Sequence, residues 1–333
     1  MNGDGRPDLF AGGRVVPGRY PEPPRSFLLI NDGKGHFSDQ TDALAPQLRH
    51  IGMVTDAAWV DLDQNGAPEL VVTGEWMPIS VFGLQGGKLE NQTTRYFEKT
   101  YSGWWNTIEV ADLNRDQKPD LVVGNLGWNA QFRASDAEPA ELYYSDFDGN
   151  GSVDPVFCFY IQGKSYPYLT RDELGAQLPR MKAKFTDYKS YADATLNDLF
   201  EPAVIQKAGR WTANHLSTSV FLNRGGQSML LKTLPVQAQY APVCAIAVLD
   251  ANADGNPDLL LCGNNSRAKL RLGKFDANYG VLLTGDGAGN FQYVPQTESG
   301  LKLQGDIRSV LVLDHRLLFG VNQGNMVAYR LKE

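Results

Sequence analysis

Short apolar stretches recur along the chain, and each stands next to a polar turn. One kind precedes a cluster of Asp and Asn residues, as at residues 57–60, 108–110 and 244–249. The other kind follows such a cluster and closes on glycine, as in Leu70-Val-Val-Thr-Gly74 and Leu259-Leu-Leu-Cys-Gly263. Short runs bounded by turn residues predict strands rather than helices.

A second pattern joins two apolar runs through a turn rich in Asn, Asp and Gly. It occurs at residues 27–37, 220–226 and 281–291. Turns of this composition between apolar runs favour β-hairpins. Together the two patterns give four strands in each period of about 50 to 60 residues, which is the unit of a propeller blade. We therefore predict an all-β fold, a β-propeller of four-stranded blades.

The periods divide the chain into about six blades, or seven if other strands complete the ring. We expect one propeller domain over residues 1–333, in which the last unit keeps strands at 309–314 and 317–321 but lacks an acidic loop. A partly helical insertion is expected near 161–218, where Thr170-Arg-Asp-Glu173 has the form of a capping box. A second helical stretch is expected over 188–200. The insertion would pack against the blades or form a lid over a ligand site.

The acidic loops between the paired strands share one frame. Side chains that carry oxygen stand at positions 1, 3, 5 and 9, and glycine stands at position 6. Ca²⁺ takes six to eight oxygen ligands, and a tight turn brings alternate side chains onto one ion. Glycine suits the left-handed backbone of such a turn. An EF-hand would need a Glu at position 12 and flanking helices, and neither is present.

Three copies of the loop are unusual, two in their residues and one in its place along the chain. The N-terminal copy begins at Met1-Asn2 and keeps only Asn2, Asp4 and Asp8 as ligands. We therefore expect the chain to begin inside a metal loop, and whether this loop holds metal stays open. Gln117 replaces the glycine of another copy, so we predict a left-handed residue and a weaker site there. The copy at Asp146 follows its predecessor closely and is predicted to replace the last hairpin of the third blade.

These loops, each followed by a strand that closes on glycine, resemble FG-GAP or VCBS repeats. Such repeats form the propellers of integrin α-subunits and of cartilage-acidic-protein-like secreted proteins of bacteria. The resemblance covers most of the chain outside residues 161–218. It implies an extracellular, cell-surface or periplasmic protein, with any export signal outside this chain, and about four structural Ca²⁺ sites. The implied ligands are Asp61, Asp63, Asn65 and Glu69; Asp112, Asn114, Asp116 and Asp120; Asp146, Asp148, Asn150 and Asp154; Asp250, Asn252, Asp254 and Asp258.

The predicted metal loops change how the net charge of the chain is interpreted. The chain has 31 Lys and Arg against 38 Asp and Glu, which gives a formal charge of −7. Acidity of this kind argues against nucleic acid as a partner. Twelve of the acids lie in the four complete loops, however, so four bound Ca²⁺ would bring the chain to +1. No apolar run approaches the roughly 18 residues of a membrane helix, so we expect no membrane span.

The three cysteines are too few for a disulfide framework. Cys244 and Cys262 stand on the two strands of one predicted hairpin, where they could face each other. They would then form one disulfide or remain two buried free thiols.

Propeller topology places the turns after each second strand on the face opposite the metal loops, together with the connections between blades. Trp, Tyr, Arg and Asn supply rigid contact area and hydrogen bonds, so their gathering there predicts a recognition surface. The expected partner is a protein or a polysaccharide, although any single Trp could instead pack between blades. The predicted ligand-binding residues are Trp76, Trp104, Trp105, Asn125, Trp128, Asn129, Arg133, Arg267, Arg271 and Arg308, and the same face gathers Arg14, Arg19, Tyr20, Asn106, Asn264, Asn265 and Lys269.

Motifs of catalysis are few in this sequence. It contains no Gly-x-Ser-x-Gly elbow, phosphate-binding loop or His-Glu-x-x-His pair. A polysaccharide hydrolase or lyase would need acids at the central opening, for which Glu75 and Asp306 are the candidates. We expect a binding protein and not an enzyme. The alternatives are such a hydrolase or lyase, or a scaffold domain of a larger protein.

Overall fold

The computed structural model describes residues 4–269, 271 and 273–331, which form six antiparallel sheets. The first sheet holds β1 (Leu9–Ala11), β2 (Phe27–Asn31) and β3 (Phe37–Asp39). The second sheet holds β4 (Met53–Val60), β5 (Glu69–Pro78), β6 (Ser80–Gln85) and β7 (Lys88–Asn91), with β8 (Ser102–Trp104) paired to the end of β5. The third sheet holds β9 (Thr107–Ala111), β10 (Asp120–Gly124), β15 (Ser219–Leu222) and β16 (Leu230–Thr233).

Three sheets complete the chain. The inserted sheet has the order β13-β12-β11-β14, with β11 at Ala140–Ser145, β12 at Asp154–Ile161, β13 at Lys164–Pro167 and β14 at Gly209–Ala213. The fourth sheet holds β17 (Val243–Leu249), β18 (Asp258–Gly263), β19 (Val281–Gly285) and β20 (Phe291–Val294). The last sheet holds β21 (Ile307–Leu313), β22 (Arg316–Val321) and β23 (Val327–Arg330).

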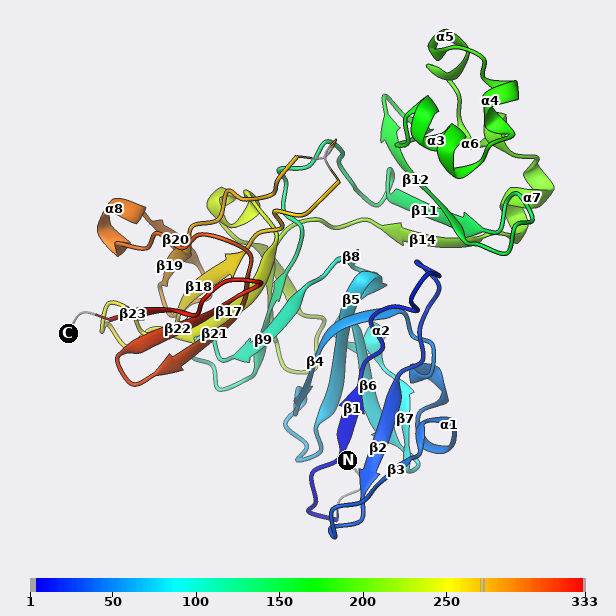
Figure 1. Cartoon of the computed structure of the whole chain (residues 1–333). Coiled ribbons are helices and arrows are strands. Elements are labelled where there is room, and N and C mark those ends of the chain that lie inside the picture. The colour runs from blue at the N-terminus through cyan, green and yellow to red at the C-terminus, as the bar shows by residue number, and fades with distance from the viewer. Residues whose placement is uncertain (1–3, 270, 272, 332–333) are drawn as a thin grey trace.

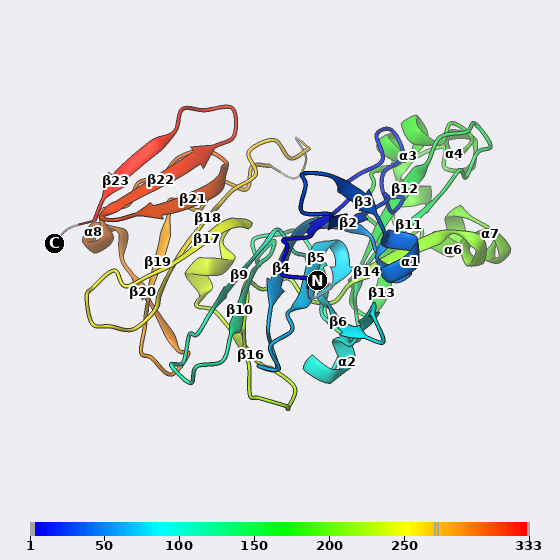
Figure 2. The same ribbon diagram turned by 90° about the horizontal axis from the view of Figure 1, so that it is seen from below.

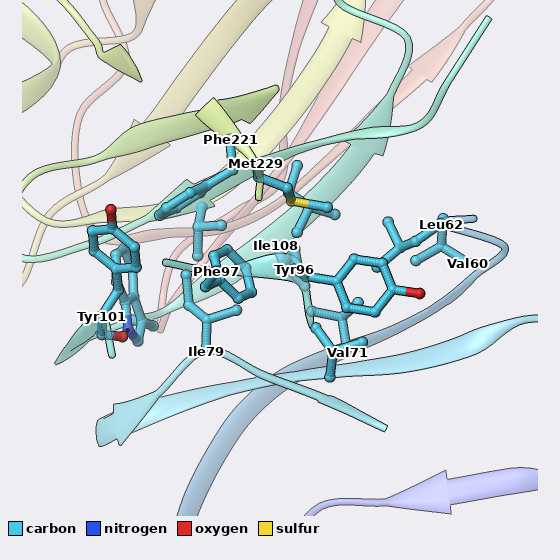
Figure 3. Packing of buried hydrophobic residues seen from close by; sticks show 14 residues of the cluster. Val60, Leu62, Val71, Ile79, Tyr96, Phe97, Tyr101, Ile108, Phe221 and Met229 are labelled. Carbon is cyan, nitrogen blue, oxygen red and sulfur yellow. Dashed lines mark hydrogen bonds between the residues drawn. The ribbon is translucent and has the colours of Figure 1, made fainter. Parts of the chain in front are cut away.

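Apolar residues on both faces of each central strand join neighbouring sheets. In β5, Leu70 and Val72 lie in a cluster shared with the first sheet, whereas Val71 lies in a cluster shared with the third. Successive side chains of a strand point to opposite faces, so a strand covered on both faces is a continuous apolar run. Figure 3 shows the second of these clusters, in which Phe221 and Ile108 of the third sheet face Val71 and Ile79 of the second.

The sheets therefore stack in chain order. Four clusters join the first sheet to the second, the second to the third, the third to the fourth, and the fourth to the last. Figures 1 and 2 show the first sheet, in blue, and the last sheet, in red, apart from each other with other sheets between them. The first strands of four of these sheets, β4, β9, β17 and β21, lie side by side along this stack.

The third sheet is composed of other strands than the third blade predicted from the sequence. β10 pairs directly with β15, although residues 125–218 separate the two strands in the chain. Strands on both sides of the insertion, β9 and β10 before it and β15 and β16 after it, thus contribute to one sheet. The insertion begins earlier than the predicted 161–218 because it carries its own sheet. The Asp146 loop is consequently the β11–β12 turn of the inserted sheet and not a hairpin of the third sheet.

Short helices cover the inserted sheet, as Figure 1 shows. They are α3 (Arg171–Gln177), α4 (Met181–Lys184), α5 (Tyr188–Tyr191), α6 (Leu196–Leu199) and α7 (Pro202–Lys207). Thr170 and Glu173 form the predicted capping box of α3, and the stretch expected over 188–200 is two short helices. Their apolar side chains pack on β12 through Val156 and Cys158.

Other short helices occupy connections between strands. They are α1 (Thr41–Leu44), the 3₁₀ turn η1 (Pro46–Leu48), α2 (Thr93–Tyr96), η2 (Val236–Gln239) and α8 (Gln296–Ser299). In the described part of the chain, no helix has both the length and the apolar character needed to cross a membrane.

The cysteines are free thiols. Cys244 lies where the β17–β18 register shifts, and Cys262 pairs with Ala245 beside it. Burial raises the pKa of the Cys262 thiol above its ordinary range, because a thiolate would lose its hydration there. The alternative of two free thiols is thus the one observed.

Candidate metal loops and binding pocket

The four complete acidic loops share one hydrogen-bond pattern. In the loop at 61–69, the Asp61 carboxylate accepts the backbone N–H groups of Asn65 and Gly66 at 3.0 and 2.8 Å. The amide oxygen of Asn65 accepts the N–H of Ala67 at 2.8 Å. The loops at 112–120, 146–154 and 250–258 repeat these bonds at the matching positions. Alternate side chains therefore point to the inside of the turn, as the spacing predicts.

The acid at position 9 is buried in every complete loop. Asp120 accepts the N–H of Leu113 in its own loop at 2.9 Å and the N–H of Asn223 at the end of β15 at 2.7 Å. Asp258 does the same with Ala251 and Gly285, both at 2.8 Å. This side chain thus ties the loop to the third strand of its sheet. Burial raises the pKa of Asp120 to about 6, and the nearby Asp116 and Asp112 add to the shift.

This raised pKa gives the first testable prediction. Asp120 holds its proton more tightly in the folded than in the unfolded chain, so its contribution to stability is present near pH 4 and lost as the pH rises through 6. In buffer with EDTA, the stability advantage of the wild type over Asp120→Asn should shrink by roughly 1–2 kcal/mol between pH 4.5 and 7. Urea unfolding of both proteins at each pH measures this difference in the free energy of unfolding. A stability advantage of the wild type that grows with pH would contradict the raised pKa of Asp120.

Two loops gather three carboxylates each. Carboxylate oxygens of Asp61, Asp63 and Glu69 lie within 4.8 Å of one another, as do those of Asp146, Asp148 and Asp154. Like charges held so close repel, and a bound cation would offset the repulsion. The chemistry of these donors, all of them oxygen, suits Ca²⁺.

The surroundings of the loop at 61–69 supply one polar atom without a hydrogen-bond partner and one cationic side chain. Among the described residues, the Tyr96 hydroxyl is the buried side-chain polar atom without a hydrogen-bond partner. It points toward the Val60 and Leu62 end of its cluster, where the loop begins (Figure 3). Its pKa is raised by burial and by the negative charge of Glu69 and Asp63. Arg95 forms an ion pair with Asp63 at 2.8 Å, which offsets part of that charge.

The other two complete loops have fewer free carboxylate oxygens. Asn stands at position 3 in both, and each position-5 acid already has a partner. Asp116 binds the Lys118 ammonium group at 3.0 Å, and Asp254 accepts the side-chain N–H of Asn252 at 2.9 Å. In the N-terminal loop, Asn2 lies outside the described residues, and Asp8 accepts the N–H of Asn31 at 3.0 Å.

The backbone at Gln117 adopts the predicted left-handed conformation, with φ of +67°. Glycine at this position should relieve the strain of a side chain in this region and stabilise the protein by about 0.5–1 kcal/mol. The urea midpoint of Gln117→Gly, at unchanged m-value, measures the gain. Lys118→Gly is the matched control and should lower the midpoint, because it removes the ion pair with Asp116. A Gln117→Gly variant no more stable than wild type would refute the expectation.

A pocket lies at the opposite ends of the same strands. β5, β10 and β18 each begin at a position-9 acid and run away from the loops. The pocket is lined by residues at or just beyond their far ends, including Glu75, Leu126 and Asn264. Its volume is about 760 Å³. The loops and the pocket therefore occupy opposite ends of these strands.

Aromatic rings form one wall of the pocket. The ring centres of Trp76 and Trp104 are 4.1 Å apart, and Phe157 of the inserted sheet contacts both rings edge-on. The backbone of Trp76 has φ of +62°, a conformation that bulky residues rarely adopt. Strained residues of this kind cluster at functional sites.

Polar groups complete the lining. The Glu75 carboxylate accepts the Tyr20 hydroxyl at 2.7 Å and pairs with the Arg14 guanidinium. Burial and the charge of Glu75 raise the pKa of Tyr20, so this hydroxyl stays protonated. Across the pocket, the Arg271 guanidinium lies 4.0 Å from the centre of the Tyr168 ring. The lining includes four basic side chains, those of Arg14, Lys269, Arg271 and Arg308, and one carboxylate.

Comparison with protein families identifies the repeats. The model of the FG-GAP-like repeat family matches residues 1–72 and 61–123. Residues 1–123 are therefore similar to FG-GAP-like repeats. The matched residues include the loops at 61–69 and 112–120, whereas the loops at 146–154 and 250–258 lie beyond them. No curated protein matches the chain.

Four of the ten residues predicted to bind a ligand line the pocket, which lies at the strand ends opposite the FG-GAP-like loops. They are Trp76, Trp104, Arg271 and Arg308. The others do not line it. Trp105 is fully buried between the second and third sheets, and Asn125 is buried with its side chain bonded to the backbone of Trp104, Leu126 and His215. Trp128, Asn129, Arg133 and Arg267 lie outside the lining.

Sequence reasoning missed the wall that the inserted sheet contributes. Phe132, Leu142, Phe157 and Tyr168 belong to a segment whose pairing with the FG-GAP-like part was not apparent. Alternation of Phe157 and Phe159 with smaller residues is a signal for a strand, but it does not say which face meets the pocket. Asp306, a candidate acid, lies outside the lining and accepts the Ser266 N–H and hydroxyl at 2.9 and 3.1 Å.

Proposed function

We propose that this chain is a Ca²⁺-stabilised β-propeller domain that binds an acidic polysaccharide through the pocket. Support for the propeller comes from the FG-GAP-like repeats and from the four-stranded sheets stacked in chain order. The blade number of about six, or seven in a completed ring, remains part of the proposal. The domain would act outside the cytoplasm, at the cell surface, in the periplasm or in the extracellular space, where Ca²⁺ sites of modest affinity are filled.

Calcium would have a structural role. The loops at 61–69 and 146–154 would hold it through their three carboxylates, and the loops at 112–120 and 250–258 would contribute weaker sites. Bound Ca²⁺ would supply the positive charge that lets these carboxylates lie together. Hydrogen bonds within the chain add to this, because Asp120 and Asp258 fix the loops at 112–120 and 250–258 against the third strand of their sheets.

The pocket lining is the observation that carries the ligand class. The partly exposed Trp104 and Phe157, which pack on the buried Trp76, offer apolar surface on which sugar rings stack, and the tyrosine and asparagine groups offer hydrogen bonds. Four basic side chains and Glu75 line the pocket, and Arg271 and Arg308 also pair with Glu173 and Asp306 just outside the lining, so the positive charge that favours an anionic ligand exceeds the negative charge by one. A concave site of this size suits a few sugar units better than the flat surface of a folded protein.

Turnover of a polysaccharide is the less favoured alternative. A glycosidase places two carboxylates about 5–10 Å apart across the bond that it cleaves. In the described lining Glu75 is the one carboxylate, and Tyr20 and Arg14 already engage it. Binding without turnover therefore accounts better for this lining.

A panel of neutral, uronic-acid and sulfated oligosaccharides tests the proposal. We expect binding by calorimetry to the acidic members, weakened at least about tenfold in Trp104→Ala because the stacking wall is lost. Trp128→Ala is the matched control and should bind as the wild type does, since Trp128 lies outside the lining. Binding that is equal in the two variants, or shortened products in the wild-type reaction, would overturn the proposal.

A further inference from the structure

The face of the inserted sheet that meets the pocket carries a row of aromatic rings. The turn at residues 162–163 has positive φ at both positions, +51° and +78°, so a two-residue hairpin joins β12 to β13. This turn fixes the register, in which Phe159 pairs with Tyr166, and the N–H of Tyr168 donates to the Phe157 carbonyl at 2.7 Å. Successive side chains of a strand alternate between faces, so these four rings share one face. We call them the aromatic row.

The aromatic row continues from the pocket into a neighbouring one. This second pocket has a volume of about 560 Å³, and Phe159 and Tyr166 contribute to its lining. Phe157 lines the pocket already described, and Tyr168 lines both. The centre of the Tyr168 ring lies 5.3 Å from that of Phe157 and 5.5 Å from that of Phe159. The aromatic surface is therefore unbroken from one pocket to the other.

The rings of the aromatic row are open to a ligand. All four are partly exposed. Aromatic rings that gather on a concave surface, and not in a core, are typical of ligand sites. A tyrosine ring combines an apolar face with a hydroxyl group that forms hydrogen bonds. The aromatic row thus suits a chain of units with apolar faces and polar edges, which is what an oligosaccharide presents.

Two cationic side chains accompany the aromatic row. The exposed Lys164 places its ammonium group 5.2 Å from the centre of the Tyr166 ring, and Arg271 lines both pockets. The charge of Arg271 is partly offset by Glu173, which lies 3.3 Å away, and Asp193 brings a carboxylate to the lining. Because these charges nearly balance, stacking would supply most of the binding in the second pocket, and Lys164 would bind an acid group of the ligand.

We propose that the acidic polysaccharide continues from the pocket along the aromatic row, and that the second pocket binds further units of the same sugar chain. This inference rests on the proposed function. Two contiguous sites reinforce each other, because a ligand held in one reaches the other at a high effective concentration. Affinity would therefore depend on the length of the sugar chain.

Calorimetry with linear uronic-acid and sulfated oligosaccharides of about two to ten units tests the proposal. The wild type should bind the longest members at least about tenfold more tightly than the shortest. Tyr166→Ala should bind the shortest members as the wild type does and lose most of this gain. Ile161→Asp should act in the same way, because it places a like charge at a site of the second pocket that is 50% exposed.

Tyr188→Ala is the matched control. Tyr188 is 65% exposed and lies outside both linings, so this variant should keep the full gain with chain length. Unfolding midpoints establish that the three variants are folded.

The outcomes separate this inference from the proposed function. Wild-type binding that does not tighten with chain length would overturn the second site and leave the proposed function intact. A gain that survives in both Tyr166→Ala and Ile161→Asp would place the additional units elsewhere and overturn the second site as well. If no acidic oligosaccharide binds at any length, the proposed function fails, and the second site fails with it.

Discussion

Chelation with EGTA is expected to lower the Tm of this protein at pH 7 by at least about 5 °C. A ligand at a hundredfold excess over its Kd stabilises the folded state by about 2.7 kcal/mol for each site. One kcal/mol corresponds to roughly 2–4 °C in larger domains. Two loops with three close carboxylates each would both lose their counterion on chelation. Thermal unfolding in CaCl₂, and then in EGTA, measures the difference.

The chain provides its own control for this experiment. Asn occupies position 3 in the loops at 112–120 and 250–258, so Asp63→Asn with Asp148→Asn keeps a residue that the loop backbone accepts. This double variant should fold but lose most of the Tm shift between the two buffers. An equal Tm of the wild type in CaCl₂ and EGTA would show that the loops are held by hydrogen bonds alone.

Trp105→Ala should destabilise the protein by about 3–5 kcal/mol, the range for removing a large aromatic side chain from a core. Trp105 is 0% exposed, stacks on His215 with ring centres 5.5 Å apart, and donates its indole N–H to the Tyr101 carbonyl at 3.2 Å. Its neighbours in the cluster come from two sheets, so the cavity would lie at their boundary. The urea midpoint measures the loss.

Trp128→Ala is the comparison for this prediction. Trp128 is 39% exposed and its substitution should cost about 1 kcal/mol or less. A Trp105→Ala variant as stable as Trp128→Ala would mean that the boundary between the second and third sheets contributes little to stability.

The loops could be predicted residue by residue because their chemistry is local. Asp61, Asn65 and Glu69 stand at fixed offsets within one turn, so spacing alone indicates which side chains point inward. The left-handed backbone at Gln117 could be predicted for the same reason. Left-handed residues at position 4, such as Arg115 and Ala253, were not predicted, because no glycine marks that position in these loops.

The third sheet and the pocket wall could not be predicted in this way. Pairing of β10 with β15 depends on contacts between strands that residues 125–218 separate, and short apolar runs do not specify their partners. The neighbours Trp104 and Trp105 show that the sequence also does not distinguish a pocket residue from a core residue beside it. One side chain lines the pocket and the other fills a core, because β8 ends between them at the edge of the second sheet.

The inserted sheet has a consequence for how this protein could evolve. The chain leaves the third sheet after Gly124 and returns at Ser219, and Val123 pairs directly with Ser219, so the two junctions are adjacent. Loop-closure entropy changes slowly with loop length, so inserts of different size are tolerated between the same two strands. The segment carries Phe157 and Tyr168 of the pocket wall but none of the residues of the apolar cluster that joins the third sheet to the fourth. Recombination at this single point of the gene could therefore exchange one wall of the binding site as a cassette, and ligand preference could diverge while the repeats stay unchanged.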